Sequence, residues 1–193
     1  MGADSSTSKG NARSRARAHR AQLLNDQHVS PPRQLRSSAL LELHGLRGRQ
    51  IRRIAAYSSY GTEPDTSALI ADLLTEGIEV LLPRMEGVDL AWVTITTDTD
   101  YEINDRGIRE PLGDDRGLGD VDVVLVPALA MTRSGDRLGQ GAGFYDRALT
   151  GIPRASEGGP LLVAVVYADE LLDESTWPVE PHDIRMDDVI TIE

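Results

Sequence analysis

The 193-residue sequence contains no cysteine, so it can form neither a disulfide nor a thiolate nucleophile. No apolar run approaches the roughly 18 residues of a membrane-spanning helix, and the N-terminus lacks the apolar core of a signal peptide. The four histidines, His19, His28, His44 and His182, stand too far apart for a metal-ligand spacing. These absences favour a cytoplasmic enzyme or binding protein with no membrane partner.

Negative charge dominates the chain, with a formal net charge of -11, but the charge is unevenly spread. Residues 1–53 carry 11 Lys and Arg against 3 Asp and Glu, whereas the remainder carries 9 against 28. A basic N-terminus can bind nucleic acid, yet this one has no interleaved aromatics, and the acidic remainder would repel a polyanion. We therefore expect no nucleic-acid partner. A small polyanion such as ATP fits the distribution better; the alternative is a solvated basic helix that pairs with the acidic body.

Periodicity predicts helices that alternate with short apolar strands. Helices are expected over 9–24, from Ser30 onward with the apolar stripe Leu35, Ala39, Leu43 and Leu46, and over 66–76, 143–149 and 168–173. Strands are expected over 51–57, 78–82, 90–95, 121–126, 161–167 and 189–192, with 96–119 irregular. This alternation predicts an α/β fold. We expect a disordered stretch over 1–8 and, over 9–193, a single three-layer α/β/α domain with a mainly parallel, Rossmann-like sheet.

The most distinctive segment is the glycine-rich run that follows the predicted strand 121–126. Gly139, Gly141 and Gly143 alternate there, with Arg137 just before them and Asp146 just after. A glycine-dense turn that enters a helix exposes backbone N–H groups suited to phosphate, and a neighbouring arginine adds charge-assisted hydrogen bonds. An aspartate one turn into the helix could hold Mg²⁺. The run is neither a P-loop nor a dinucleotide fingerprint, and glycines alone more often mark a plain loop.

The predicted N-terminal helix carries a basic face. Lys9 is the only lysine of the chain. Arg13, Arg17 and Arg20 follow it at i+4, i+8 and i+11, so the four side chains lie on one face of the helix. Like charges so arranged cost stability unless a negative group faces them, so either an anion binds there or the face is simply solvated. Segments 58–65, 127–146 and the turn at His182-Asp183 precede or follow predicted strands, and they could converge at the carboxyl edge of the sheet.

The order of these features resembles the 5-formyltetrahydrofolate cyclo-ligase family, also called methenyltetrahydrofolate synthetases. The family signature is Pro-Gly-Leu-Ala, a spacer, and Arg-Leu-Gly-x-Gly-x-Gly-Tyr-Tyr-Asp; here Val126-Pro-Ala-Leu-Ala130 precedes Arg137-Leu-Gly-Gln-Gly-Ala-Gly-Phe-Tyr-Asp-Arg147. Further matches, in order along nearly the whole chain, are Lys9 with Arg13, Glu63, Pro83-Arg84, Glu110-Pro111 and His182-Asp183.

The resemblance implies ATP- and Mg²⁺-dependent cyclisation of 5-formyltetrahydrofolate, polyglutamylated or not, to 5,10-methenyltetrahydrofolate with release of ADP and phosphate. It implies catalytic roles for Arg137 and Asp146, and Mg²⁺ ligation by Asp146 and Asp183. ATP would contact Lys9, Arg13, Arg137, Leu138, Gly139, Gln140, Gly141, Ala142, Gly143, Phe144 and Tyr145. The folate would contact Ser58, Glu63, Gln140, Gly141, Ala142, Gly143 and Phe144. A monomer or weak homodimer is expected.

Four positions depart from the family pattern. Gln140 and Ala142 replace frequent basic or glycine residues, Phe144 replaces a tyrosine and so lacks one hydroxyl, and Ala128 replaces a glycine. These departures favour an alternative, a non-catalytic nucleotide- or folate-binding protein on the same scaffold. Aromatic residues make up only 4% of the chain, which leaves Tyr60, Trp92 and Phe144 as the obvious stacking partners for a pterin.

Overall fold

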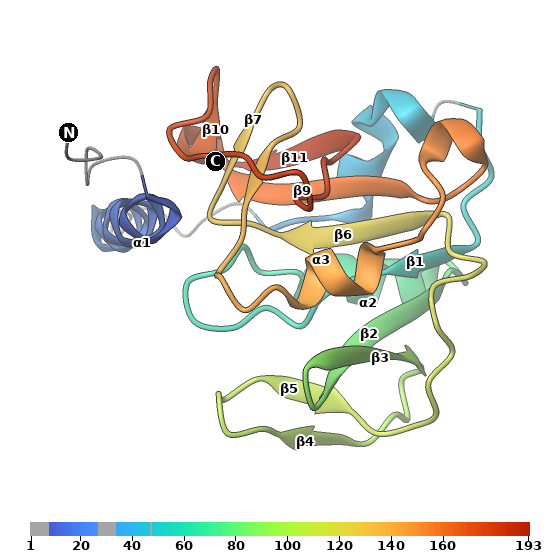
Figure 1. The fold of residues 1–193 in the computed structure, drawn as a ribbon. Helices are drawn as coiled ribbons and strands as arrows, with labels where there is room; N and C mark the ends of the chain where they lie inside the picture. The colour runs from blue at the N-terminus through green and yellow to red at the C-terminus, as the bar shows by residue number, and fades with distance from the viewer. Residues whose placement is uncertain (1–7, 27–33, 47) are drawn as a thin grey trace, which may run out of the picture.

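A computed structural model describes residues 8–26, 34–46 and 48–193, and its centre is a six-stranded sheet (Figure 1). The strand order is β11-β9-β6-β1-β2-β3. These strands are β1 (Arg53–Ala55), β2 (Glu79–Glu86), β3 (Asp89–Ile95), β6 (Val123–Pro127), β9 (Leu161–Tyr167) and β11 (Asp188–Ile192). Every neighbouring pair is parallel except the β2–β3 hairpin. The predicted mainly parallel sheet is therefore confirmed.

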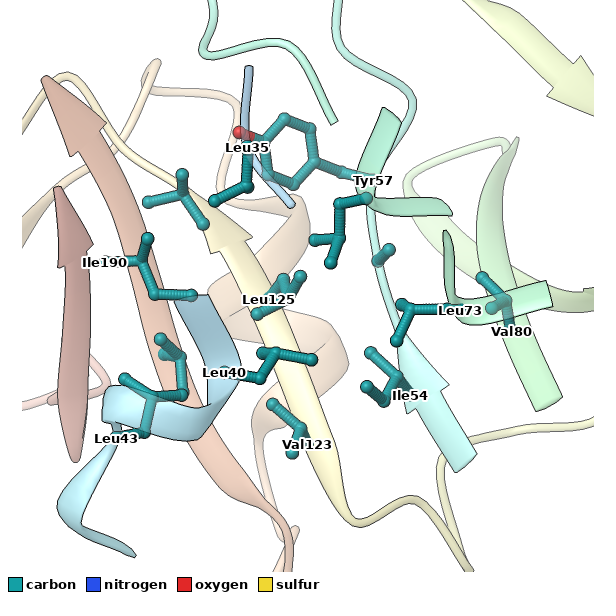
Figure 2. Close-up of a cluster of buried hydrophobic side chains, with 14 of the residues drawn as sticks. Leu35, Leu40, Leu43, Ile54, Tyr57, Leu73, Val80, Val123, Leu125 and Ile190 are labelled. Carbon is teal, nitrogen blue, oxygen red and sulfur yellow. The ribbon is translucent and has the colours of Figure 1, made fainter. Parts of the chain in front are cut away.

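Helical segments cover both faces of this sheet because successive strand residues point to opposite sides. Ile54, Val80 and Val123 pack on one side with α2 (Ser67–Thr75) and the 3₁₀ helices η2 (Ser37–Glu42) and η3 (His44–Leu46); Figure 2 shows this cluster. Ala55, Leu81 and Val124 pack on the other side, where α3 (Phe144–Leu149) contributes Leu149. The apolar runs of the strands are thus explained by two-sided burial, and the predicted three layers are confirmed.

The stripe that predicted a second long helix is buried, but it lies in 3₁₀ turns. Hydrogen bonds run from the Leu43 amide to the Leu40 carbonyl and from the Leu46 amide to the Leu43 carbonyl, three residues apart. Gly45 approaches the sheet closely, since a Cβ there would stand 2.5 Å from Leu161 Cδ1. The prediction of one continuous helix is wrong over 37–46. The start expected at Ser30, and the disorder expected over 1–7, lie outside the described residues.

The segment expected to be irregular, 96–119, contains a two-stranded hairpin of β4 (Tyr101–Ile103) and β5 (Arg109–Pro111). The Asn104 side chain accepts hydrogen bonds from the Arg106 and Ile108 amides and closes the turn between them, at 2.9 and 3.0 Å. Strands of three residues are too short for a visible alternation, which explains why periodicity missed them.

A second small sheet orders the segment that precedes the glycines. It consists of β10 (Leu171–Leu172), β7 (Ala130–Thr132) and β8 (Arg137–Leu138). The helix predicted over 168–173 is instead the 3₁₀ helix η5 (Ala168–Glu170) followed by β10, because Leu171 and Leu172 pair with β7. One further 3₁₀ helix, η4 (Ala155–Glu157), lies before β9.

The N-terminal helix α1 (Lys9–Asp26) packs mainly against the small sheet (Figure 1), and its Arg20 also stands over the Tyr167 ring of β9. Its Ala12 and Ala16 contact a cluster of Leu129, Leu138 and Trp177. Small residues at i and i+4 let the helix approach closely, and this approach brings its basic face to the carboxyl ends of the strands. None of the helices in the described ranges is long and apolar enough to cross a bilayer.

Candidate active site

A cavity of about 430 Å³ lies where the loops after β1 and β6 meet α1, the glycine-rich run and the last loop before β11. This is the carboxyl edge of the parallel strands, where ligands bind in such sheets. All the predicted site residues line this cavity: Lys9, Arg13, Ser58, Glu63, Arg137, Leu138, Gly139, Gln140, Gly141, Ala142, Gly143, Phe144, Tyr145, Asp146 and Asp183. The structure therefore brings them together, while the role of each one stays a prediction.

Two glycines of the run are required by its backbone. Gly141 has φ 106° and Gly143, which caps α3, has φ 71°, and both values are disfavoured for residues with a side chain. The absence of a side chain also admits Arg13, whose Cζ would lie 3.2 Å from a Cβ on Gly141. Arg13 Nε donates to the Gly139 carbonyl at 3.0 Å. The glycine loop and α1 are thus held together by the same guanidinium that faces the cavity.

Arg137 is fixed by an ion pair with Asp146. Its Nη2 lies 2.7 Å from Asp146 Oδ1, and the arginine side chain is only 5% exposed. Within the described residues its buried Nε has no hydrogen-bond partner. A buried guanidinium with an unsatisfied donor is costly unless a ligand oxygen completes it, so this group is well suited to bind an anion.

Lys9 is held by two carboxylates that come from the loop before β11. Its Nζ lies 2.5 Å from Glu180 Oε2 and 2.7 Å from Asp183 Oδ1. Burial opposes charge on Asp183, but hydrogen bonds from Lys9 and from the Glu180 amide outweigh it and lower the pKa of Asp183. The Lys9 pKa is raised: burial works against its charge, and the contacts with Asp183 and Glu180 prevail. Both groups therefore remain charged at neutral pH.

The rest of the basic face of α1 divides between the glycine loop and the protein interior. Arg17 donates to the Gln140 carbonyl at 2.9 Å. Arg20 is fully buried and lies outside the cavity, where its Nε and Nη2 contact Glu170 at 2.6 and 2.5 Å. Carboxylates of the acidic body thus pair with Lys9 and Arg20, as one of the two alternatives from the sequence predicted. Arg13 still lines the cavity.

Glu63 places a poorly solvated carboxyl group on another wall of the cavity. Burial raises the pKa of Glu63 to about 7. A hydrogen bond from the Tyr60 amide, the charge of Arg20 and a hydrogen bond from the Gln140 side chain each lower the pKa, but burial outweighs them. The Tyr145 hydroxyl is buried, and no hydrogen-bond partner for it is found in the described parts of the chain. Burial raises the pKa of this hydroxyl, and the nearby charge of Glu63 raises it further. This wall can exchange hydrogen bonds with a ring that is rich in N–H groups.

The donor atoms suit Mg²⁺ at two points. Asp146 and Asp183 offer carboxylate oxygens, the ligands that this ion prefers, and each already faces a cationic side chain. Glu180, His182 and Asp183 also present ligand atoms that all lie within 4.8 Å of one another. Imidazole nitrogen is a poor ligand for Mg²⁺, so the carboxylates are the fitting part of this group.

Sequence reasoning missed the wall supplied by the two hairpins. Met85, Leu90, Arg106 and Ile108 line the cavity together with Arg147. Hairpin residues carry no motif, and only the fold brings them beside the glycine loop. Among the aromatics named as stacking partners, Tyr60 and Phe144 line the cavity. The expectation for Trp92 is wrong, since it is 2% exposed in the core, edge-on to Tyr145 at 6.1 Å.

A mainly parallel α/β sheet with a charged cavity at its carboxyl edge defines a protein that binds a small polar ligand there. The model of the 5-formyltetrahydrofolate cyclo-ligase family matches residues 5–192. The 5-formyltetrahydrofolate cyclo-ligase of Mycolicibacterium smegmatis is 39% identical over 191 residues, which cover 93% of this chain and 94% of that protein. The chain therefore belongs to the 5-formyltetrahydrofolate cyclo-ligase family, and it is a ligase.

Solved structures agree with this assignment. The NMR structure of the Aquifex aeolicus 5,10-methenyltetrahydrofolate synthetase has a TM-score of 0.72 at 26% identity, and the match covers 95% of this chain and 89% of that one. A 5,10-methenyltetrahydrofolate synthetase from Mycoplasma pneumoniae has a TM-score of 0.63 at 17% identity, with 94% and 97% covered, and shows the same fold.

Proposed function

We propose that this chain converts 5-formyltetrahydrofolate to 5,10-methenyltetrahydrofolate with ATP, releasing ADP and phosphate. The observation that carries the proposal is one cavity that holds the cationic side chains Lys9, Arg13 and Arg137 together with the half-buried carboxyl of Glu63. The cations suit a triphosphate, and the carboxyl suits the N–H groups of a pterin. Both substrates would therefore meet within a single enclosed space.

The chemistry needs an activated leaving group and no protein nucleophile. The formyl oxygen attacks the γ-phosphorus and the bond to ADP breaks, which converts a poor leaving group into a phosphate ester. The folate N10 then attacks the formyl carbon, the carbon–oxygen bond breaks, phosphate departs, and N10 gives its proton to phosphate or water. Phosphoryl transfer of this kind depends mostly on positioning and charge neutralisation.

The chain's own groups would supply that positioning. Arg137, which is almost buried and has a spare donor, would bind phosphate oxygens, with Lys9 and Arg13 beside it. The backbone from Leu138 to Tyr145 would wrap the triphosphate. Asp146 and Asp183 would hold Mg²⁺, which when bound supplies positive charge to the phosphates. Lys9 would then leave Asp183 for the phosphate.

The test is an absorbance assay for methenyltetrahydrofolate in the near ultraviolet, with protein, ATP, Mg²⁺ and 5-formyltetrahydrofolate. Product that depends on both ATP and Mg²⁺, with ADP formed in equal amount, supports the proposal. Binding of both compounds without product would favour the non-catalytic alternative that Gln140, Ala142 and Phe144 suggest.

A further inference from the structure

Two arginines stand over the Phe144 ring at the edge of the cavity. Arg106 Cζ lies 5.5 Å and Arg147 Cζ 5.2 Å from the ring centroid, and both residues are exposed and line the cavity. They come from separate elements, since Arg106 is in the turn between β4 and β5 and Arg147 is in α3. We call these two residues the arginine rim.

The two guanidinium groups differ in the donors that remain available. Arg147 is committed to the backbone, because it donates to the Val88 and Ala142 carbonyls and lies 3.7 Å from Asp89. Arg106 has only its contact with Phe144, and over the described ranges no carboxylate approaches its guanidinium within 4.0 Å. A cation held over an aromatic ring, with its N–H groups unused, is prepared to bind an anion.

The cavity also has an apolar part. Pro83, Met85, Leu90 and Ile108 form this part of the lining. In Figure 1, α1 and the β4–β5 turn both lie on the side of the molecule to which the carboxyl ends of the strands point, with the turn below α1. Besides the cations of α1 and the carboxyl of Glu63, the lining therefore contains an apolar part and the second group of cations in the arginine rim.

We propose that the arginine rim binds the glutamyl carboxylates of the folate, and that Arg106 is a specificity-determining residue for them. This inference rests on the proposed function, because a folate consists of a pterin, an aminobenzoyl ring and a glutamyl tail. The lining offers a group for each part: the carboxyl of Glu63 for the pterin, apolar side chains for the ring, and the guanidinium groups of the arginine rim for the tail carboxylates. The triphosphate would lie with Lys9, Arg13 and Arg137.

The experiment compares 5-formyltetrahydrofolate with 5-formyltetrahydropteroate, which lacks the glutamate, in wild type and in Arg106→Gln. KM is measured by the absorbance assay and Kd by calorimetry. Wild type should prefer the glutamate-bearing compound, and Arg106→Gln should reduce that preference by roughly threefold to tenfold, as for a partly exposed charged contact. Arg106→Lys should keep part of it, and added salt should weaken it.

Arg109→Gln is the matched control, because Arg109 lies on the same hairpin over the Tyr101 ring, at 3.5 Å, but not in the cavity. If the substitutions act by weakening the hairpin, both variants should change KM for both compounds alike. If Arg106 binds the glutamyl tail, only Arg106→Gln should lose the preference for the glutamate-bearing compound. An unchanged preference in Arg106→Gln, or equal loss in Arg109→Gln, overturns the inference while the proposed function stands. If wild type neither binds nor converts either compound, both fail.

Discussion

At the scale of single residues, Glu63 is a carboxyl group whose surroundings differ strongly from water. Burial raises its pKa to about 7 in the folded protein, whereas an unfolded glutamate titrates near 4.5. Between these values the folded chain keeps a proton that the unfolded chain has lost. Stability therefore falls as the pH rises from 4.5 to 7, and the cost is complete above pH 7.

Glu63→Gln removes this cost because an amide cannot ionise. We expect the variant to exceed wild type in the free energy of unfolding by about 2 kcal/mol at pH 8, with a difference that shrinks toward pH 4.5. Urea unfolding at several pH values measures it. Glu102→Gln, at an exposed position of β4, is the control and should show no such trend. A difference between Glu63→Gln and wild type that does not vary with pH would show that the carboxyl is well solvated.

Asp146 is the second residue whose role can be isolated. Asp146→Asn keeps the size of the side chain and an oxygen for Arg137 Nη2, which lies 2.7 Å from Asp146 Oδ1, but it removes the negative charge that would hold Mg²⁺. Turnover should fall by roughly 100-fold or more, in line with losses on removing one electrostatic catalytic group. The melting temperature should fall as well, because the nearly buried Arg137 loses its counter-charge, so turnover is compared well below it. The absorbance assay at varied Mg²⁺ measures this, and wild-type turnover would refute the metal role.

At the scale of elements, α1 is attached to the body by a buried ion pair. Arg20 and Glu170 have side-chain exposures of 0% and 2%, and Arg20 Nη2 also donates to the Ala128 carbonyl at 2.6 Å. This attachment positions the other end of the helix, where Lys9 and Arg13 face the cavity. The pair therefore contributes to the site without touching it.

Glu170→Gln should lower the free energy of unfolding by about 3–5 kcal/mol, because it leaves Arg20 buried without its counter-charge. It should also raise the KM for ATP, since α1 carries Lys9 and Arg13, two of the cations proposed to bind the phosphates. Chemical denaturation and steady-state kinetics measure the two effects. Asp173→Asn breaks the exposed pair with Arg133 and should change stability by less than about 0.5 kcal/mol. Equal effects of the two substitutions would contradict the role of the buried pair.

The start of α3 offers a second test at this scale. Gly143→Ala and Gly151→Ala both place a Cβ at positive φ, 71° and 79°, and each should cost about 1 kcal/mol of stability. Only at Gly143 does the added atom meet a neighbour, Arg147 Nη1 at 2.8 Å. Gly143→Ala alone should therefore raise KM for the folate, whereas an equal KM effect in both would mean that strain, and not the shift of Arg147, is responsible.

At the scale of the whole molecule, the uneven charge is partly resolved by the fold. The basic N-terminal region folds back onto the acidic remainder, and Lys9 and Arg20 meet carboxylates 171 and 150 residues away. Long-range pairing thus places the basic helix α1 against the acidic body of the protein. Of the cations beside α1 and the glycine run, Arg13 has no carboxylate contact within the described residues, and Arg137 has one, with Asp146.

Ligand binding should stabilise the assembled molecule. MgATP at about 100 times its Kd should add about 2.7 kcal/mol to the free energy of unfolding and raise Tm by roughly 5–10 °C. Adenosine, which lacks the phosphates, should raise it far less. Thermal melts with each compound test this expectation, and equal shifts would contradict binding through the cationic side chains.

Much of the fold was predictable from local pattern. The apolar runs at 121–126 and 161–167 predicted strands because two-sided burial leaves no room for polar residues, and β6 and β9 confirm them. The pattern failed where the elements are short: the hairpin at 101–111, and Leu40 to Leu46, whose spacing fits both a helix and successive 3₁₀ turns. Three-residue strands carry too little periodicity to be distinguished from loops.

The sequence by itself determined the alternation of strands and helices and the glycine-rich run, and the order of motifs along the chain indicated part of the set of residues that line the cavity. Only the tertiary structure decided that Trp92 is core, that Arg20 pairs with Glu170, and that Arg106 stands over Phe144. The reason is physical: backbone preference and burial period act over a few neighbouring residues. The partner of a charge or a ring is set instead by chain segments that meet only when the whole sheet has formed.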